Sequence, residues 1–267
     1  MGRSGSKLTR YKEDYKHCKE TKSFGLDIST ANSTECQYIQ NSNIAKRKRF
    51  GQFFTPLNIA EIMSDWVLGC KPKTLLDPAV GTGILLKALV NKSNATFKCD
   101  VFDIDPTILS FFDETRIPNM EVQKFNADFL TYKINNTYEG VIMNPPYLRH
   151  HDLVYKLSIH DHIAKLVGSS ISRLSNAYVL FVMKACHYLS EGGRGAFIIP
   201  SEWTNSNFGE SFKSYLIDFA GLQEVIYFTN DINVFDNALT TASILLVEKG
   251  KRNKTISVRC VDTNNCT

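Results

Sequence analysis

No part of this chain approaches the ~18 consecutive apolar residues that a membrane-spanning helix needs. Its first residues are polar and basic, and they lack the apolar stretch of a secretory signal. These two absences predict a cytoplasmic protein with no membrane anchor. The chain has 267 residues, 43% of them hydrophobic, which is enough for the core of one large α/β domain or two small ones.

The sequence also lacks the patterns of metal sites and of disulfide frameworks. The seven cysteines are scattered and form no Cys-x-x-Cys pair, so we expect free thiols in a reducing compartment and no metal. Four of the six histidines lie close together without a recognised metal-ligand spacing. They suit a loop that contacts phosphate or closes over a site. These histidines are His150, His151, His160 and His162.

Positive charge is concentrated at one end of the chain. Residues 1–49 hold eleven Lys/Arg against five Asp/Glu, a local balance of +6, whereas the whole chain carries only +4. Residues 1–45 are polar and poor in periodic apolar positions, which predicts a flexible basic arm. Such an arm either neutralises phosphates or is a solvated tail.

The rest of the chain alternates between short apolar runs and segments of helical periodicity. We expect strands at 74–76, 97–104, 120–125, 140–143, 195–199, 224–228 and 242–248, and helices at 57–68, 84–90, 176–189 and 208–219, with another starting at Pro106. This alternation predicts a doubly wound, mostly parallel sheet. We expect one domain over 46–250, an insertion or lid within it over 148–174, and a short extension over 251–267.

Polar residues follow the predicted strands at the points where they end. Asp77, Asp103, Asp128 and Asn144 each stand at or just after a strand end. In doubly wound sheets ligands bind beyond the carboxyl ends of the strands. We therefore expect these four residues to share one site.

The first of these strand ends opens a glycine loop, Asp77-Pro78-Ala79-Val80-Gly81-Thr82-Gly83. Its glycines let the backbone turn tightly and approach a ligand closely. The spacing is not Gly-x-Gly-x-x-Gly, and no Gly-Lys-Ser/Thr follows, which disfavours a phosphate cradle for NAD or ATP. Asp77 adds a carboxylate suited to a cationic ligand such as an amino group or a sulfonium.

The next two acids have separate predicted roles. Asp103 ends the second strand, where an acidic residue accepts ribose hydroxyls in nucleoside-binding sheets. The alternative ribose acceptor is Asp105, which could instead cap a helix that opens at Pro106. Asp128 could accept from an adenine amino group while Phe129 packs on the ring, or it could be a helix cap or loop acid.

The tetrapeptide Asn144-Pro145-Pro146-Tyr147 follows the fourth strand. Proline restrains the residue before it to an extended conformation, so the asparagine amide and the Pro145 carbonyl can act as two aimed acceptors. Tyr147 offers a flat face on which a base can stack. The pattern suits a site that holds a planar amino group, although Asn-Pro also occurs in simple turns.

Taken in order, these motifs resemble those of class I S-adenosylmethionine-dependent methyltransferases that act on amino nitrogens. Gly51-Gln52-Phe53-Phe54-Thr55-Pro56, which precedes them, is similar to the N-terminal cofactor motif of gamma-class adenine-N6 DNA methyltransferases of type II restriction–modification systems. The likeness extends over about residues 50–250 and includes Gly195 to Trp203. It implies a Rossmann-like sheet with a terminal antiparallel strand.

The resemblance also implies a cofactor, a substrate and site residues. S-adenosylmethionine would be the methyl donor, double-stranded DNA the substrate, and a flipped-out adenine would stack on Tyr147 and Phe235. The expected catalytic residues are Asn144, Pro145, Pro146 and Tyr147. The expected cofactor-binding residues are Phe53, Thr55, Pro56, Asp77, Pro78, Gly81, Gly83, Asp103, Asp128 and Phe129.

Full enzymes of this group carry a target-recognition domain after the last of these motifs, and none is apparent here. We expect either a catalytic fragment of a longer protein or a subunit whose partner reads the DNA sequence. Two other functions remain open. The same tetrapeptide serves enzymes that methylate an RNA base or a protein glutamine amide, and a non-catalytic DNA-binding or assembly subunit could keep the fold.

Overall fold

The structure, a computed structural model, describes residues 38, 51–52, 54–150, 158–206, 209–229, 242–253 and 255–262. Eight strands form one sheet in the order β3-β2-β1-β4-β5-β7-β6-β8. The strands are β1 Thr74–Asp77, β2 Phe97–Asp103, β3 Met120–Asn126, β4 Tyr138–Met143, β5 Leu189–Pro200, β6 Leu222–Thr229, β7 Ala242–Glu248 and β8 Ser257–Asp262. Strand β7 is antiparallel to its neighbours β5 and β6, and all other pairs are parallel. The predicted doubly wound, mostly parallel sheet is therefore confirmed.

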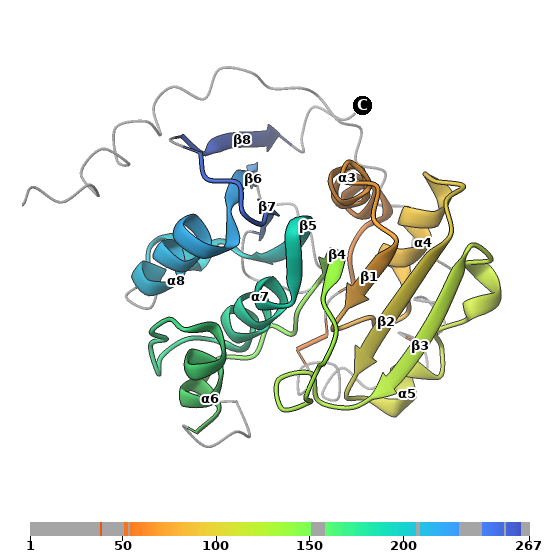
Figure 1. Cartoon of the computed structure of the whole chain (residues 1–267), viewed down its shortest axis with the longest axis horizontal. Helices are drawn as coiled ribbons and strands as arrows, with labels where there is room; N and C mark the ends of the chain where they lie inside the picture. The colour runs from red at the N-terminus through yellow and green to blue at the C-terminus, as the bar shows by residue number, and fades with distance from the viewer. Residues whose placement is uncertain are drawn as a thin grey trace, which may run out of the picture.

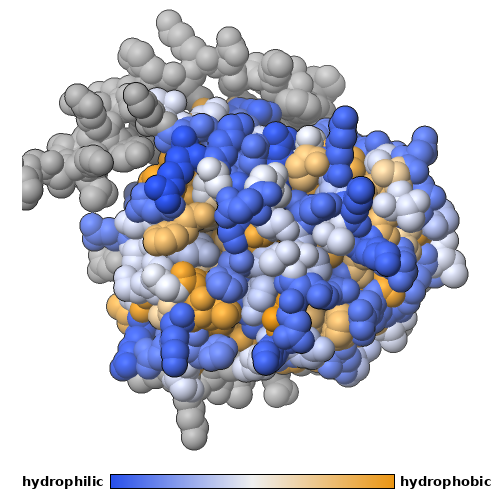
Figure 2. All heavy atoms as spheres, viewed as in Figure 1, coloured by the Kyte–Doolittle hydropathy of each residue, from blue (hydrophilic) through white to orange (hydrophobic). Residues whose placement is uncertain are grey.

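Helices cover both faces of this sheet (Figure 1). They are α3 Leu57–Leu68, α4 Ile84–Asn91, α5 Pro106–Leu109, α6 Ser158–Val167, α7 Ala177–His187 and α8 Gly209–Tyr215, with short turns at Glu114–Arg116, Ser201–Thr204 and Leu216–Ala220. None of the helices in the described ranges has the length and apolar character needed to cross a bilayer. On the face shown in Figure 2, hydrophilic residues predominate and hydrophobic ones occur in scattered groups.

Neighbouring residues along each strand enter two different cores. Leu75 packs with α3 and α4, whereas Leu76 packs with α6 and α7, because successive side chains of a strand point to opposite faces. Ile244 and Leu245 of β7 divide in the same way. A sheet buried on both faces needs apolar residues at every position, and this explains why the central strands are continuous apolar runs.

The strand order reverses between β1 and β4. From β1 the chain proceeds outward to β2 and β3, and it then returns to place β4 on the other side of β1. Leu75 pairs with Gly140 and Leu76 with Val141. A side chain on Gly140 would collide with Leu75 and with Val67 of α3, so the glycine permits this close packing. Such a reversal opens a crevice beyond the carboxyl ends of the two strands.

The first difference from the expected elements concerns β5. This strand begins at Leu189, within the helix expected at 176–189, and not at Gly195, and it includes Gly192 and Gly193. The pairing of β4 with β5 shifts register before Gly140, so the glycines form an irregularity within the strand. Gly192 has a φ of 75°, a conformation that glycine adopts without strain.

Two further differences lie outside the predicted elements. Strand β8 falls within residues 251–267, where no element was expected, and it pairs in parallel with β6 at the sheet edge. Strand β8 has only one neighbouring strand, so Val258 is exposed. The strand therefore lacks the continuous apolar run that marks the central strands. Helix α6 falls within the predicted insertion at 148–174 and contributes Ile159, Ile163 and Val167 to the core.

Residue Tyr38 lies within the predicted arm, and its side chain is nevertheless fully buried. The ring contacts Phe54 and Phe111 edge-on, at centroid distances of 5.9 and 5.4 Å. This residue is therefore packed onto the domain.

We predict that Leu245→Ala lowers the free energy of unfolding by about 2–5 kcal/mol, because it leaves a cavity in the buried sheet. The matched substitution Val258→Ala, at an edge-strand residue that is 53% exposed, should change it by less than about 0.5 kcal/mol. Urea unfolding of both variants measures the difference. Equal losses would contradict the placement of β7 in the interior of the sheet.

Candidate active site

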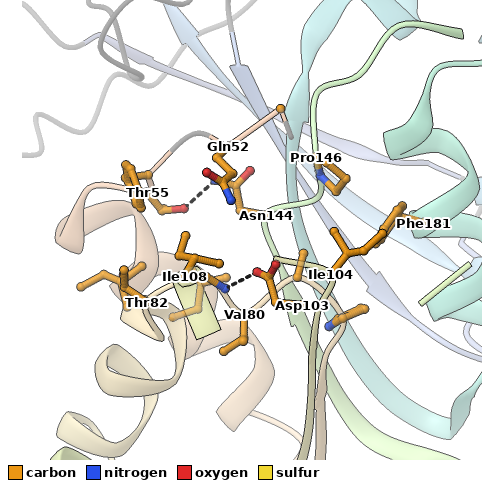
Figure 3. Close-up of a pocket in the computed structure, with 17 residues that line it drawn as sticks. Gln52, Thr55, Val80, Thr82, Asp103, Ile104, Ile108, Asn144, Pro146 and Phe181 are labelled. Carbon is orange, nitrogen blue, oxygen red and sulfur yellow. Dashed lines mark hydrogen bonds between the residues drawn. The ribbon is translucent and has the colours of Figure 1, made fainter. Parts of the chain in front are cut away.

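A cavity of about 680 Å³, part of it open to solvent, lies beyond the carboxyl ends of β1, β2 and β4. It is lined by the loop that follows β1 with the start of α4, by the end of β2, by Ile108 of α5 and by the turn that follows β4 (Figure 3). Residues before α3 also line it: Gly51, Gln52, Phe54 and Thr55. Phe181 of α7 completes the wall.

The loop after β1 forms the floor of the cavity. Gly81 and Gly83 have φ values of 56° and 86°, in the left-handed region that favours glycine. A side chain on Gly83 would collide with the ring of Phe112, whereas one on Gly81 would meet little. Pro78 and Gly81 line the cavity, so the backbone itself is the surface presented to a ligand there.

Asp103 reaches the cavity as the last residue of β2. Its Oδ2 accepts the Gly81 N–H at 3.1 Å, and its Oδ1 accepts the Asp105 N–H at 2.9 Å. Burial raises the pKa of Asp103 to about 6, and these two N–H groups oppose the rise. At neutral pH the carboxylate is ionised and held in place, and its remaining lone pairs can accept hydroxyl groups.

Two roles were open for Asp105, ribose acceptor and helix cap, and in the structure it is a helix cap. Its Oδ1 accepts the Thr107 N–H at 2.9 Å, as the N-cap of α5. Its Oδ2 accepts from Gln52 Nε2 at 3.2 Å and from the Tyr38 hydroxyl at 3.3 Å. Gln52 Oε1, at 2.8 Å, shares the same Tyr38 hydroxyl hydrogen. The three side chains form one hydrogen-bonded group, and its member Gln52 lines the cavity; of the two acids, Asp103 lines the cavity and Asp105 does not.

Asp77 is fully buried at the end of β1. Its Oδ1 accepts the Ala79 N–H at 3.1 Å, and its Oδ2 has no hydrogen-bond partner among the described residues. Burial raises the pKa of Asp77 to about 8, and the nearby Asp103 carboxylate adds to this rise. A buried carboxylate of this kind gains stability when a cation is placed beside it. The residues that follow it, Pro78 and Ala79, line the cavity.

The turn after β4 is joined to the segment that contains residues 51–55. Asn144 Nδ2 donates to Thr55 Oγ1 at 3.0 Å (Figure 3), and the Tyr147 N–H donates to the Gly51 carbonyl at 3.1 Å. The Tyr147 hydroxyl donates to the Ile198 carbonyl of β5 at 3.1 Å. These bonds hold the asparagine amide and the tyrosine ring from both sides. Because Thr55 takes the Nδ2 group, Oδ1 is the atom of Asn144 that can accept from a ligand.

Gly51 makes this junction possible. Its φ is 61°, and a side chain there would come within 2.7 Å of the Tyr147 nitrogen. Pro56, the N-cap of α3, accepts the Ala60 N–H at 3.0 Å through its carbonyl. Phe53 lies outside the described residues, as does Phe235, so their predicted roles stay predictions.

Asp128 and Phe129 are not among the residues that line the cavity. Asp128 Oδ1 accepts the Leu130 N–H at 2.9 Å, and its Oδ2 accepts from the Thr131 hydroxyl at 3.2 Å. Phe129 is buried, and its ring centroid lies 5.4 Å from that of Phe181. The structure thus gives Phe129 a packing position behind Phe181. Direct contact of Asp128 or Phe129 with a bound adenine stays a prediction.

Sequence reasoning missed the apolar side walls of the cavity. Ile104 is 52% exposed although it is a large hydrophobic residue, and it lines the cavity together with Ile108 and Phe181. Walls of this kind suit a planar ring. Phe181 has no signal in the sequence, because α7 is apolar almost throughout. Ile104 could have been found from its place directly after Asp103.

Three of the four clustered histidines lie within the described residues, and their settings differ. His160 is buried on α6, where Nε2 contacts the Ser175 carbonyl at 3.1 Å, whereas His150 and His162 are exposed. His151 lies outside the described residues. Within the described part of the chain, no three His, Cys, Asp or Glu side chains are grouped so as to hold a metal ion.

Comparisons with known proteins place these features in a family. The Eco57I restriction-modification methylase family matches residues 36–235. Type II methyltransferase M.AccI of Acinetobacter calcoaceticus is 39% identical over 220 residues, which cover 80% of this chain and 40% of that protein. Type II methyltransferase M.HincII of Haemophilus influenzae is 27% identical over 224 residues, covering 83% and 41%. The chain thus spans about two fifths of the length of these relatives.

A solved structure agrees with the fold. A crystal structure of a Listeria monocytogenes protein assigned to the class I S-adenosylmethionine-dependent methyltransferases superimposes with a TM-score of 0.64 at 18% identity, covering 79% of this chain and 65% of that one. The fold is that of class I methyltransferases. It implies S-adenosylmethionine as the methyl donor, and the cavity fits this group: it has an acid at the end of β2, a glycine in its floor and apolar walls, and the buried Asp77, whose Oδ2 has no hydrogen-bond partner among the described residues, directly precedes the floor residues.

We predict that the affinity for S-adenosylhomocysteine rises with pH between about 6.5 and 7.5, toward tenfold per unit. The reason is that its ammonium group binds the ionised form of Asp77, whose pKa in the free protein is raised to about 8. Asp77→Asn should weaken binding and abolish this pH dependence, whereas Asp65→Asn, at an exposed ion pair with Lys92, should change neither. Isothermal titration calorimetry across this pH range tests it. A wild-type affinity that does not change with pH would rule out the assignment.

Proposed function

Because the chain belongs to the Eco57I restriction-modification methylase family, we propose that it methylates the N6 amino group of adenine in DNA. The observation that carries the proposal is the fixed Asn144 amide at the cavity, held by Thr55 at 3.0 Å. The names of the matched relatives describe type II methyltransferases. A DNA substrate for this chain follows from that kinship.

Several residues would hold the cofactor. When bound, S-adenosylmethionine supplies a methyl group on a positively charged sulfur. Asp103 would accept the ribose hydroxyls and Asp77 would face the amino group, while Ile104 and Phe181 would enclose the adenine ring. Because Gly81 has no side chain, the cofactor could lie close to the protein backbone at the floor of the cavity.

Asn144 and Pro145 would prepare the substrate nitrogen. The lone pair of an adenine amino group is delocalised into the ring, which makes the nitrogen a poor nucleophile. Two acceptors, Asn144 Oδ1 and the Pro145 carbonyl, would bind its two N–H groups and favour the pyramidal geometry needed for attack. Acceptors that bind the transition state better than the ground state raise the rate. Direct displacement then needs no covalent link to the protein.

The target base must leave the duplex to reach this cavity, at a cost of a few kcal/mol. Stacking on Tyr147, whose hydroxyl is tethered to Ile198, would offset ~1–3 kcal/mol. Phe235 would add a second ring. We propose that a target-recognition domain or subunit, separate from the cavity described above, reads the DNA sequence.

A radiolabel experiment tests the proposal. The chain is incubated with S-[methyl-³H]adenosylmethionine and, in separate reactions, with duplex DNA, RNA and protein, and the products are hydrolysed and separated. We expect label in N6-methyladenine from DNA, and none with Asn144→Ala. Label in N4-methylcytosine would refute the adenine assignment, and label confined to RNA or to glutamine would refute the DNA substrate.

Thr55→Val tests whether the asparagine amide must be held. Valine keeps the shape of the side chain and removes the hydroxyl that accepts from Asn144 Nδ2, so the amide loses its fixed orientation. We expect kcat to fall about tenfold, corresponding to the loss of one hydrogen bond in the transition state, with a smaller change in cofactor affinity. Thr115→Val, at an exposed hydroxyl bonded to Asp113, is the matched control. A Thr55→Val enzyme with unchanged kcat would exclude this role.

A further inference from the structure

Lys184 is a buried lysine in the last turn of α7, only 1% exposed. Its Nζ donates to three backbone carbonyls of the loop after β3: Phe129 at 2.6 Å, Leu130 at 3.0 Å and Tyr132 at 2.8 Å. The same atom lies 5.0 Å from the centroid of the Phe129 ring. One ammonium group therefore joins a loop to a helix through every N–H donor that it has.

Burying a charged ammonium group in the core costs more free energy than burying an apolar side chain there. An apolar side chain would pack α7 against the sheet equally well, but it would leave three converging carbonyl oxygens without a donor. Burial lowers the pKa of Lys184 to about 8, and the charge of Asp128 opposes this. The amine thus keeps its proton at neutral pH. The three hydrogen bonds from the amine hold the loop in one conformation. Packing of α7 against the sheet would not by itself require this.

The loop held in this way begins with Asp128. The Thr131 and Tyr132 N–H groups donate to the Asp128 carbonyl at 3.2 and 2.9 Å, so residues 128–132 form one compact turn. The carbonyls bound by Lys184 belong to this turn. Its position relative to α7 is therefore set by the lysine.

Lys184 also lies one helical turn from the cavity. Phe181, three residues earlier on α7, lines the cavity, and its ring packs on Phe129 with centroids 5.4 Å apart. Lys184, Phe129 and Phe181 form a continuous contact from the loop to the cavity wall. A shift of the loop would displace the acid at its start and the ring behind Phe181 together.

We propose that Lys184 is a positioning residue for the adenine end of the cofactor cavity, and that it sets the distance between Asp128 and Phe181. The proposal rests on the proposed function and on the prediction from the sequence that Asp128 accepts from the amino group of the cofactor's adenine. Lys184 itself touches neither the cofactor nor the base. Its effect is selectivity for an adenine ring that carries an amino group.

Binding of two ligands tests this. S-adenosylhomocysteine carries the amino group, and S-inosylhomocysteine carries a carbonyl oxygen in its place, which an acceptor at Asp128 would repel. We expect the wild-type protein to prefer the adenosyl ligand by about tenfold or more in Kd, as for one hydrogen bond to a charged group. In Lys184→Met the preference should fall to within about threefold, through weaker binding of the adenosyl ligand.

Lys249→Met is the matched control. Lys249 Nζ donates to the Cys186 and His187 carbonyls at 3.2 and 2.8 Å, at the C-terminal end of the same helix and outside the turn at 128–132. We expect it to lower thermal stability and to keep the preference between the two ligands. If Lys184 had a structural role only, Lys184→Met and Lys249→Met would show the same ratio of Kd values for the two ligands.

The outcomes separate the two proposals. If the wild-type protein binds neither ligand, the proposed function fails. If it prefers the adenosyl ligand and Lys184→Met keeps that preference in full, the role of Lys184 is overturned and the function stands. Should Lys184→Met fail to fold, Lys184→Gln, which retains two N–H donors, is measured in its place. A ratio at least threefold lower than wild type supports the proposal, and an unchanged ratio overturns it.

Discussion

The parallel pairing of β1 with β4 is the constraint on which the rest of the site depends. Leu75 and Leu76 pair with Gly140 and Val141, although the two strands are separated in the chain by all of β2 and β3. This pairing brings the acid that ends β1 and the asparagine that follows β4 to the same edge of the sheet. With these two residues adjacent, the other elements only have to supply the side walls of the cavity between them.

A second set of contacts closes that cavity. The segment with Gly51 and Thr55 lies before α3, yet it bonds directly to the turn after β4. The Tyr38 hydroxyl and Gln52 then bond to Asp105 at the end of β2. Chemistry-bearing groups from three distant parts of the chain are thus held by hydrogen bonds to each other.

Two acids and one base lie at or near the cavity. Asp103 lines it and the buried Asp77 directly precedes its floor, and the pKa values of both are raised. A cationic ligand beside them would add compensating charge. Lys184 is buried one helical turn from Phe181, and three backbone carbonyls accept its N–H groups. Under the proposal made above, it would affect a ligand only through the loop that it positions.

The sequence alone determined the class of sheet, the strand ends that carry polar groups, and the tetrapeptide at residues 144–147, because these depend on local periodicity and on backbone chemistry. It did not reveal β8, whose apolar pattern is weakened at the sheet edge, nor the irregular start of β5. Among the site residues, it could not separate Asp103 from Asp105 in space, and it gave no sign of Phe181, Tyr38 or Lys184. Those roles arise only when helices and loops from distant positions pack together. Tertiary structure decided them because burial, and the bonds it enforces, are properties of the assembled fold.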